Sequence, residues 1–97
     1  MSNKAYKLTA SGKVYDGPCV LYGVYVGPDG SNDPTLSVFN NTVASGDEVL
    51  PTATFQAAQG LQGVTLPEGG VDCPKGVYGE ITLSAGSVEI IFYIKPK

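Results

Sequence analysis

Two alternating runs near the end of the chain decide the fold: Val77-Tyr-Gly-Glu-Ile-Thr-Leu-Ser84 and Val88-Glu-Ile-Ile-Phe-Tyr-Ile-Lys95. In each run every second position is an apolar residue or glycine, which is the period of a β-strand with one buried face. The residues between the runs, Ser84-Ala-Gly-Ser87, are typical of a tight turn. The sequence therefore predicts two strands joined as a hairpin.

The rest of the chain is divided into short segments by 13 Gly and 7 Pro. None of these segments has the i, i+3, i+4, i+7 apolar spacing of an amphipathic helix. Strands are expected at residues 5–10, 13–15, 19–26, 35–40, 48–50, 52–56, 60–66 and 71–73, with a break at Pro51. Short strands at this spacing are typical of antiparallel two-layer folds. We predict an all-β fold, a small antiparallel β-sandwich or jelly-roll-like barrel of six to eight short strands.

The chain has 97 residues, which is enough for one domain and one core. Residues 1–10 are expected to form an N-terminal arm or a first strand, and residues 11–97 a single β-sandwich domain. The segment 19–26 is apolar on both faces apart from Gly23. A strand of this kind is covered on both sides, so its second face is expected to lie under a loop or another subunit.

Composition excludes several kinds of activity. The chain has no His, and its six basic residues are all Lys, so the commonest acid–base group and the bidentate guanidinium clamp are both missing. The net charge of -3 argues against a nucleic-acid partner. We expect no enzymatic activity, no cofactor and no metal. The longest apolar run, 88–94, is far shorter than a membrane span and contains Glu89. With no signal-like segment at the start, the chain is expected to stay in the cytoplasm where it is made and to have no membrane partner.

Three groups of residues are candidates for a reactive or metal-binding site. Cys19 and Cys73 are expected to be buried thiols, with a disulfide as the alternative if their strands lie side by side. The loop 29–33 carries acidic and amide side chains, which Asx-turn chemistry explains better than a calcium loop does. Asp47 and Glu48 are adjacent, so on a strand they point to opposite faces and make a poor catalytic pair.

Charge is distributed unevenly along the chain. The first fifteen residues carry three Lys and no acid, whereas all nine acidic residues follow. A basic N-terminus of this kind could bind an acidic partner surface, or it could simply be solvated. Charged residues make up only 15% of the chain, against about 25% in typical soluble domains. Either part of the surface is an interface, or Ser, Thr and Asn supply its polarity. The expected partner contacts are Lys4, Tyr6, Lys7, Tyr22 and Tyr25.

Several stretches resemble small virion β-sandwich proteins of tailed phages, of the capsid decoration, cement or head-fibre type. They include Ser11-Gly-Lys-Val14, Gly17-Pro-Cys-Val-Leu-Tyr-Gly-Val-Tyr-Val26, Leu36-Ser-Val-Phe-Asn-Asn-Thr42, Pro67-Glu-Gly-Gly-Val71, Lys75-Gly-Val-Tyr78 and Gly86-Ser-Val-Glu-Ile-Ile-Phe-Tyr93. Cys at positions 19 and 73 departs from the pattern, which usually has aliphatic or aromatic residues there. The resemblance implies a structural protein, often a homotrimer.

From the low charge, the two-sided apolar strand and the resemblance, we expect a capsid decoration or cement protein. Its partner would be the major capsid protein, and its location the capsid surface of a virion assembled in the host cytoplasm. The alternative is a tail-fibre or receptor-binding module that recognises surface glycans. A patch of exposed Tyr side chains able to stack on sugars would favour that alternative.

Overall fold

A computed structural model of the chain describes residues 4–64 and 66–97. In these residues the chain forms nine strands and one short 3-10 turn, η1 (Ala57–Gln59). The strands are β1 (Lys4–Leu8), β2 (Gly12–Asp16), β3 (Cys19–Pro28), β4 (Thr35–Phe39), β5 (Glu48–Thr54), β6 (Gln62–Val64), β7 (Val71–Cys73), β8 (Gly76–Thr82) and β9 (Val88–Pro96).

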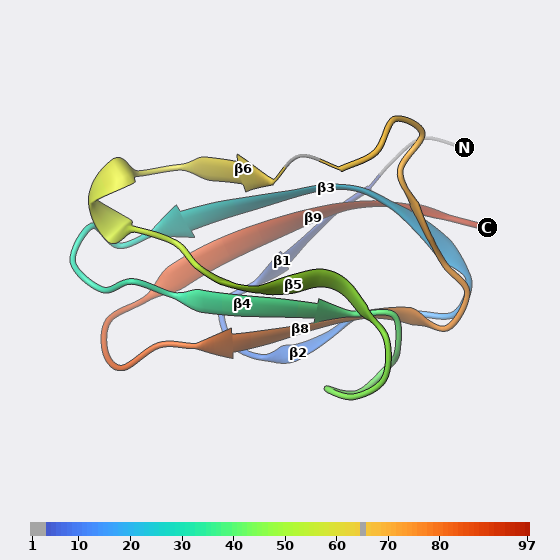
Figure 1. Ribbon diagram of the computed structural model, residues 1–97, viewed down its shortest axis with the longest axis horizontal. Helices are drawn as coiled ribbons and strands as arrows, with labels where there is room; N and C mark the ends of the chain where they lie inside the picture. Colours follow the sequence, from blue (N-terminus) through green and yellow to red (C-terminus); the bar gives the residue numbers. More distant parts are fainter. Residues whose placement is uncertain (1–3, 65) are drawn as a thin grey trace.

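The strands form two packed antiparallel sheets, which confirms the all-β class and the sandwich architecture (Figure 1). Sheet A has the order β1-β9-β3, and the far edge of β3 pairs with β6 along one half and with β7 along the other. Sheet B has the order β2-β8-β4-β5. The described part of the chain has one strand more than the upper end of the expected range.

The N-terminal segment is a strand of sheet A over Lys4–Leu8, paired along its length with β9. Met1 to Asn3, the start of the predicted arm, lie outside the described residues. Strands β1 and β2 contact each other and close one edge of the sandwich. The opposite edge lies between β5 of sheet B and β6 of sheet A.

The predicted C-terminal hairpin is wrong, although both of its strands are present. Strand β8 pairs with β2 and β4 in sheet B, whereas β9 pairs with β1 and β3 in sheet A. The segment between them therefore crosses from one sheet to the other. Alternation shows which face of a strand is buried, but it does not identify the neighbouring strand, because both sheets turn an apolar face to the same core.

The core lies between the sheets and is built mainly on β3 and β9. The inward side chains of β9, from Val88 to Ile94 at every second position, are fully or almost fully buried. On β3 the register against β9 shifts between Leu21 and Gly23. This bulge exchanges the faces of the strand, because one extra residue reverses the alternation. The inward residues of β3 are therefore Cys19, Leu21, Val24 and Val26.

Gly79 allows the two sheets to approach closely. It is buried on the inner side of β8, and a Cβ atom there would lie 2.8 Å from Leu8 Cδ1 and 3.1 Å from Phe92 Cζ. A leucine of β1 and a phenylalanine of β9 thus occupy the space that a side chain at position 79 would need. The absence of a side chain at Gly79 therefore lets residues of sheet A pack directly against the backbone of sheet B.

Strand β5 runs through Pro51 without ending, where the sequence predicted a break. Its pairing with β4 is irregular at this point, because Leu50 and Ala53 pair with Val38 and Leu36 while the two residues between them are skipped. Proline has no N–H group to donate to a ladder and is therefore tolerated on edge strands and at bulges. Pro51 satisfies both conditions.

Candidate interaction surface

The outward face of sheet A is less polar than that of sheet B. We call it the sheet A face and define it by the outward side chains of three strands. On β3 and β9 these alternate with the buried core residues, and on β1 they alternate with Tyr6 and Leu8, which pack against the core. The sheet A face comprises Ala5, Lys7, Val20, Tyr22, Tyr25, Glu89, Ile91, Tyr93 and Lys95.

A pair of tyrosines lies at the centre of the sheet A face. The rings of Tyr25 and Tyr93 are 5.7 Å apart between centroids and meet edge to face at 85°. Their exposed fractions are 43% and 38%, so both present a large apolar area to solvent. Edge-to-face contact is a favoured geometry for aromatic pairs and restrains both rings.

Glycine residues beside Tyr25 explain how its ring lies on the sheet. Tyr25 is the direct partner of Gly63 across the β3–β6 pair. A Cβ atom on Gly63 would lie 2.8 Å from Tyr25 Cε2, and one on Gly23 would lie 3.4 Å from Cε1. The Tyr25 ring therefore covers the backbone of Gly23 and Gly63. An aromatic ring placed over a strand glycine in this way stabilises the strand pairing at that position. Tyr25 has a structural role as well as an exposed surface.

A loop covers one end of the sheet A face, as expected for part of the two-sided strand. The backbone of Gly70 packs so closely that a Cβ atom there would lie 2.7 Å from Val20 Cγ1 and 3.1 Å from Tyr22 Cδ1. Val20 and Tyr22 are half-buried as a result, whereas Tyr25 lies beyond the loop. The cover inferred from the sequence is therefore provided by the chain itself at Val20 and Tyr22.

The outward face of sheet B is built differently, from hydroxyl groups that bind one another. Thr35 Oγ1 and Thr54 Oγ1 are 2.8 Å apart, and Ser37 Oγ and Thr52 Oγ1 are 2.7 Å apart. Thr52 also donates to Glu48 Oε2 at 3.2 Å. Two aromatic residues at one end of this sheet, Phe39 and Tyr78, are half-buried. A polar surface of this kind has less to gain from dehydration than an exposed aromatic pair.

The predicted contact residues of the N-terminus have different environments. Tyr6 packs against the core and meets Tyr15 edge to face, with ring centroids 5.9 Å apart. Lys7 Nζ lies 3.9 Å from Glu89 Oε2 in an exposed pair, a type of ion pair that contributes little to stability. Lys4 is exposed at the start of β1.

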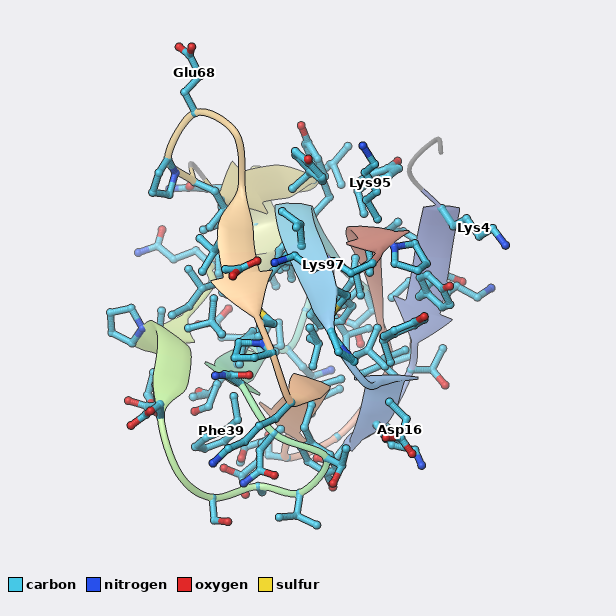
Figure 2. All side chains as sticks on the ribbon, turned by 90° about the vertical axis from the view of Figure 1, so that its right-hand side faces the viewer. Lys4, Asp16, Phe39, Glu68, Lys95 and Lys97 are labelled. Atoms are coloured by element: carbon cyan, nitrogen blue, oxygen red, sulfur yellow. The ribbon has the colours of Figure 1, made fainter. Side chains whose placement is uncertain are left out.

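Figure 2 shows that Lys4, Lys95 and Lys97 lie at one end of the sandwich, where the acidic residues Asp16 and Glu68 also lie. The β1–β9 pairing, which places Lys4 opposite Ile94, brings the two ends of the chain together. Lys97 forms an ion pair with Asp72. This end therefore carries charges of both signs, and its lysines come from both ends of the chain, not from the first fifteen residues alone.

The acidic loop after β3 is an Asx turn, as predicted. Asp29 Oδ1 accepts hydrogen bonds from the backbone N–H groups of Ser31 and Asn32, at 2.8 and 2.9 Å. Its Oδ2 accepts from Asn32 Nδ2 and from the N–H of Ser87, both at 3.0 Å. These donors lower the pKa of Asp29 well below its usual value, with the Ser31 N–H group as the largest cause. The carboxylate thus ties the β3–β4 loop to the β8–β9 crossing.

Chemically reactive groupings are sparse in the described residues. No cluster of three or more His, Cys, Asp or Glu side chains suited to a metal ion is present among residues 4–64 and 66–97. Glu48 is engaged with Thr52, as described above. In the same part of the chain, no helix is long and apolar enough to cross a membrane.

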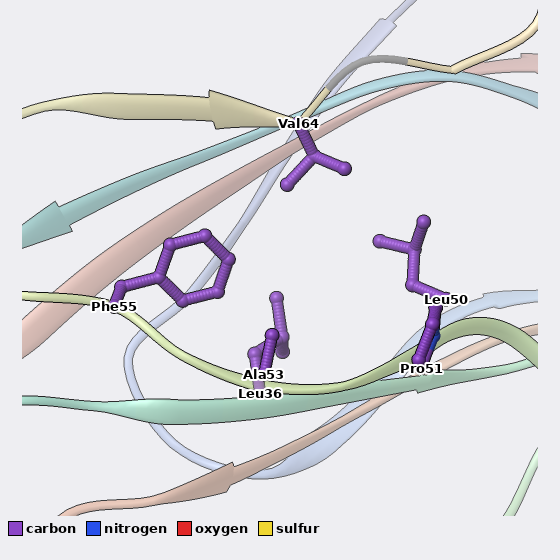
Figure 3. A pocket seen from close by; sticks show the side chains of 6 residues that line it. All are labelled: Leu36, Leu50, Pro51, Ala53, Phe55 and Val64. Atoms are coloured by element: carbon purple, nitrogen blue, oxygen red, sulfur yellow. The ribbon is translucent and has the colours of Figure 1, made fainter.

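An apolar pocket of about 130 Å³ lies at the β5–β6 edge of the sandwich, and no sequence pattern predicted it. Figure 3 shows side chains from both sheets turned toward it. Its lining contains no ionisable group, so it offers space for an aliphatic or aromatic side chain rather than for acid–base chemistry. The lining residues are Leu36, Leu50, Pro51, Ala53, Phe55 and Val64.

No protein-family model matches the chain, and neither a curated protein nor a solved structure matches it. The sheet A face and its tyrosine pair are thus the basis for inferring a function.

Proposed function

We propose that this chain is a non-enzymatic structural protein of a tailed-phage virion, a decoration or cement protein that binds the major capsid protein on the head surface. The observation that supports this proposal most directly is the exposed Tyr25–Tyr93 pair at the centre of the sheet A face. Tyrosine is enriched at protein interfaces because it combines a large apolar area with few rotatable bonds. Burying the two rings against a shell would contribute more than any contact of the hydroxyl-lined sheet B.

The rigidity of the fold supports the same proposal. The tyrosines stand on β3 and β9, which form the longest strand pairing in the described structure. A face held by a packed core loses little conformational entropy on binding, so a small contact area can still give useful affinity. In the proposed role this advantage is multiplied, because a homotrimer binds a symmetric shell through several copies of the same face.

Two lysines at one end of the molecule, Lys4 and Lys95, would orient the proposed interface. Lys95 belongs to the sheet A face and Lys4 lies at the same end of the molecule, whereas Lys97 is paired with Asp72 (Figure 2). An acidic strip on the capsid beside an apolar patch would complement this arrangement. Such rim charges mainly accelerate association and set orientation, and their effect weakens with salt.

The test is binding to purified phage heads that lack decoration proteins, measured by sedimentation and by imaging of the particles. The double variant Tyr25→Ser/Tyr93→Ser is expected to raise the dissociation constant at least tenfold, which corresponds to about 1.4 kcal/mol of binding free energy. The matched control is Val43→Ser, which removes another exposed apolar side chain, 53% exposed, in the β4–β5 loop. Full occupancy by the double variant would argue against the sheet A face, and no occupancy by the unmodified chain would argue against the decoration role.

The tyrosine pair also favours a second candidate, the tail-fibre or receptor-binding module that recognises surface glycans. An exposed aromatic ring can stack on the apolar face of a sugar. A glycan array separates the two candidates, since a glycan-binding module gives saturable signals that Tyr25→Ser removes. A decoration protein gives no glycan signal and binds heads.

A further inference from the structure

Cys19 and Cys73 lie directly opposite each other on adjacent antiparallel strands. They are Cα partners in the β3–β7 pair, and both side chains are fully buried in the core as free thiols. Cys19 Sγ lies 3.8 Å from the carbonyl oxygen of Cys73. The sequence allows a disulfide if the two strands lie side by side, and the structure meets this condition.

The backbone geometry of this pair suits a covalent bridge. Opposed residues of an antiparallel pair have Cα atoms about 4.5–5.5 Å apart. A disulfide spans Cα separations of about 4.4–6.8 Å. Because both residues point into the core from neighbouring strands, the bond can form without moving either strand to a new register.

We propose that Cys19 and Cys73 are an oxidative modification site, where a low-molecular-weight disulfide of the glutathione type converts the two thiols to a cross-strand disulfide. The first cysteine thiolate attacks a sulfur of the oxidant, which forms a mixed disulfide and releases one glutathione thiolate. The second cysteine thiolate then attacks the protein sulfur of the mixed disulfide, forms the Sγ–Sγ bond and releases the second glutathione. The protein dithiol loses two electrons and two protons, and one oxidised glutathione becomes two reduced molecules.

Strand β7 provides the route by which the oxidant reaches the buried thiols. It has three residues, and it is preceded by the Gly69–Gly70 turn and followed by Pro74. Strand β3, in contrast, is paired on both sides. Short edge strands open locally at much lower free energy than central ones. Cys73 is therefore the cysteine expected to react first.

Burial makes this oxidation slow in the closed protein. Desolvation raises the pKa of Cys19 to about 11, with the neighbouring Cys73 as a second cause, and burial also raises the pKa of Cys73. Both groups are therefore thiols at neutral pH, and the thiolate is the reactive form. A chain made in a reducing compartment would keep both thiols and would oxidise only after long exposure to an oxidising medium. This inference does not depend on the proposed function.

The experiment uses the full chain, purified with a reductant and then held in buffers with graded ratios of oxidised to reduced glutathione. After denaturation and alkylation, intact mass spectrometry is expected to show a monomer that has lost two hydrogens and takes up no alkylating agent. Proteolysis is expected to yield one linked pair of peptides that contains Cys19 and Cys73. Because the bridge closes a loop of more than fifty residues, the oxidised chain should melt roughly 10 °C or more above the reduced chain.

Two variants serve as controls. Cys73→Ala is expected to acquire at most one glutathione and to show no rise in melting temperature, and Cys19→Ala/Cys73→Ala is expected not to respond to the buffer at all. If either variant fails to fold, the comparison of oxidised with reduced wild-type chain is sufficient. The proposal is wrong if excess oxidised glutathione leaves a dithiol, gives two glutathione adducts, or links separate chains. It is equally wrong if the bridged chain melts below the reduced one.

Discussion

Replacing Gly79 by Ala is expected to destabilise the sandwich by about 1–2 kcal/mol, and the loss should largely disappear when Phe92 is replaced by Leu. The added methyl group would lie 2.8 Å from Leu8 Cδ1 and 3.1 Å from Phe92 Cζ. The end of Leu8 can rotate away, but the Phe92 ring is fully buried and cannot. Overpacking of this kind costs about 1–3 kcal/mol. Alanine also lowers the conformational entropy of the unfolded chain, which stabilises the folded protein by only about 0.4–1 kcal/mol. The steric cost is therefore the larger effect.

Phe92→Leu removes the ring atoms that the new methyl group would strike. Alone it is expected to cost about 1–2 kcal/mol through lost burial. In its presence Gly79→Ala should be close to neutral, which gives a coupling energy of about 1 kcal/mol in the double-mutant cycle. Urea unfolding of the four proteins, followed by far-ultraviolet circular dichroism at constant temperature, measures each free energy.

Gly27→Ala is the matched control for this cycle. A Cβ atom at Gly27 would meet only the carbonyl oxygen of Glu89, at 3.5 Å, which is an ordinary contact. Its effect should stay within about 0.5 kcal/mol. Strictly additive effects of Gly79→Ala and Phe92→Leu would refute the close packing of β8 against β9 and β1.

Three further predictions follow from the loops and from the sheet A face. Asp29→Asn should flatten the fall of melting temperature in acid. The wild-type carboxylate has a lowered pKa, so its stabilising effect is complete above about pH 4 and is lost as the pH falls further. Gly86→Ala should lower the melting temperature at neutral pH, because its φ is +80° and a Cβ atom would overlap the Asp29 carboxylate. Tyr25→Ala should cost about 1 kcal/mol in urea unfolding by uncovering Gly63, whereas Tyr25→Phe should cost almost nothing.

The positions of the strands could be predicted closely, but not their partners. Gly and Pro mark the ends of short strands, and a period of two marks the buried face, so both are local signals. The neighbour of a strand depends on long-range packing between the two sheets, which is not a local signal. For this reason β8 and β9 belong to different sheets and do not form a hairpin. The bulge at Tyr22–Gly23 is a similar case, because a one-residue shift reverses the faces of β3 without a clear mark in the sequence.

The candidate surface was predictable only in part. Tyr25 was named from its strand, and Tyr93 could have been added because the alternation of β9 places it outward. Their contact could not be foreseen, since it requires the register between β3 and β9. Tyr6 differs from Tyr25 because its strand turns it toward the core and Tyr15, where it is half-buried, and its role as a contact residue stays a prediction.

Pro51 has a consequence for how this protein tolerates crowding. An exposed, regular edge strand can pair with the edge of another molecule and begin an aggregate. In β5 the proline lacks a donor and stands where the ladder is already irregular, so a foreign strand could not continue along this margin. Many copies packed at high local concentration should therefore remain separate, soluble units instead of growing into fibres through this side.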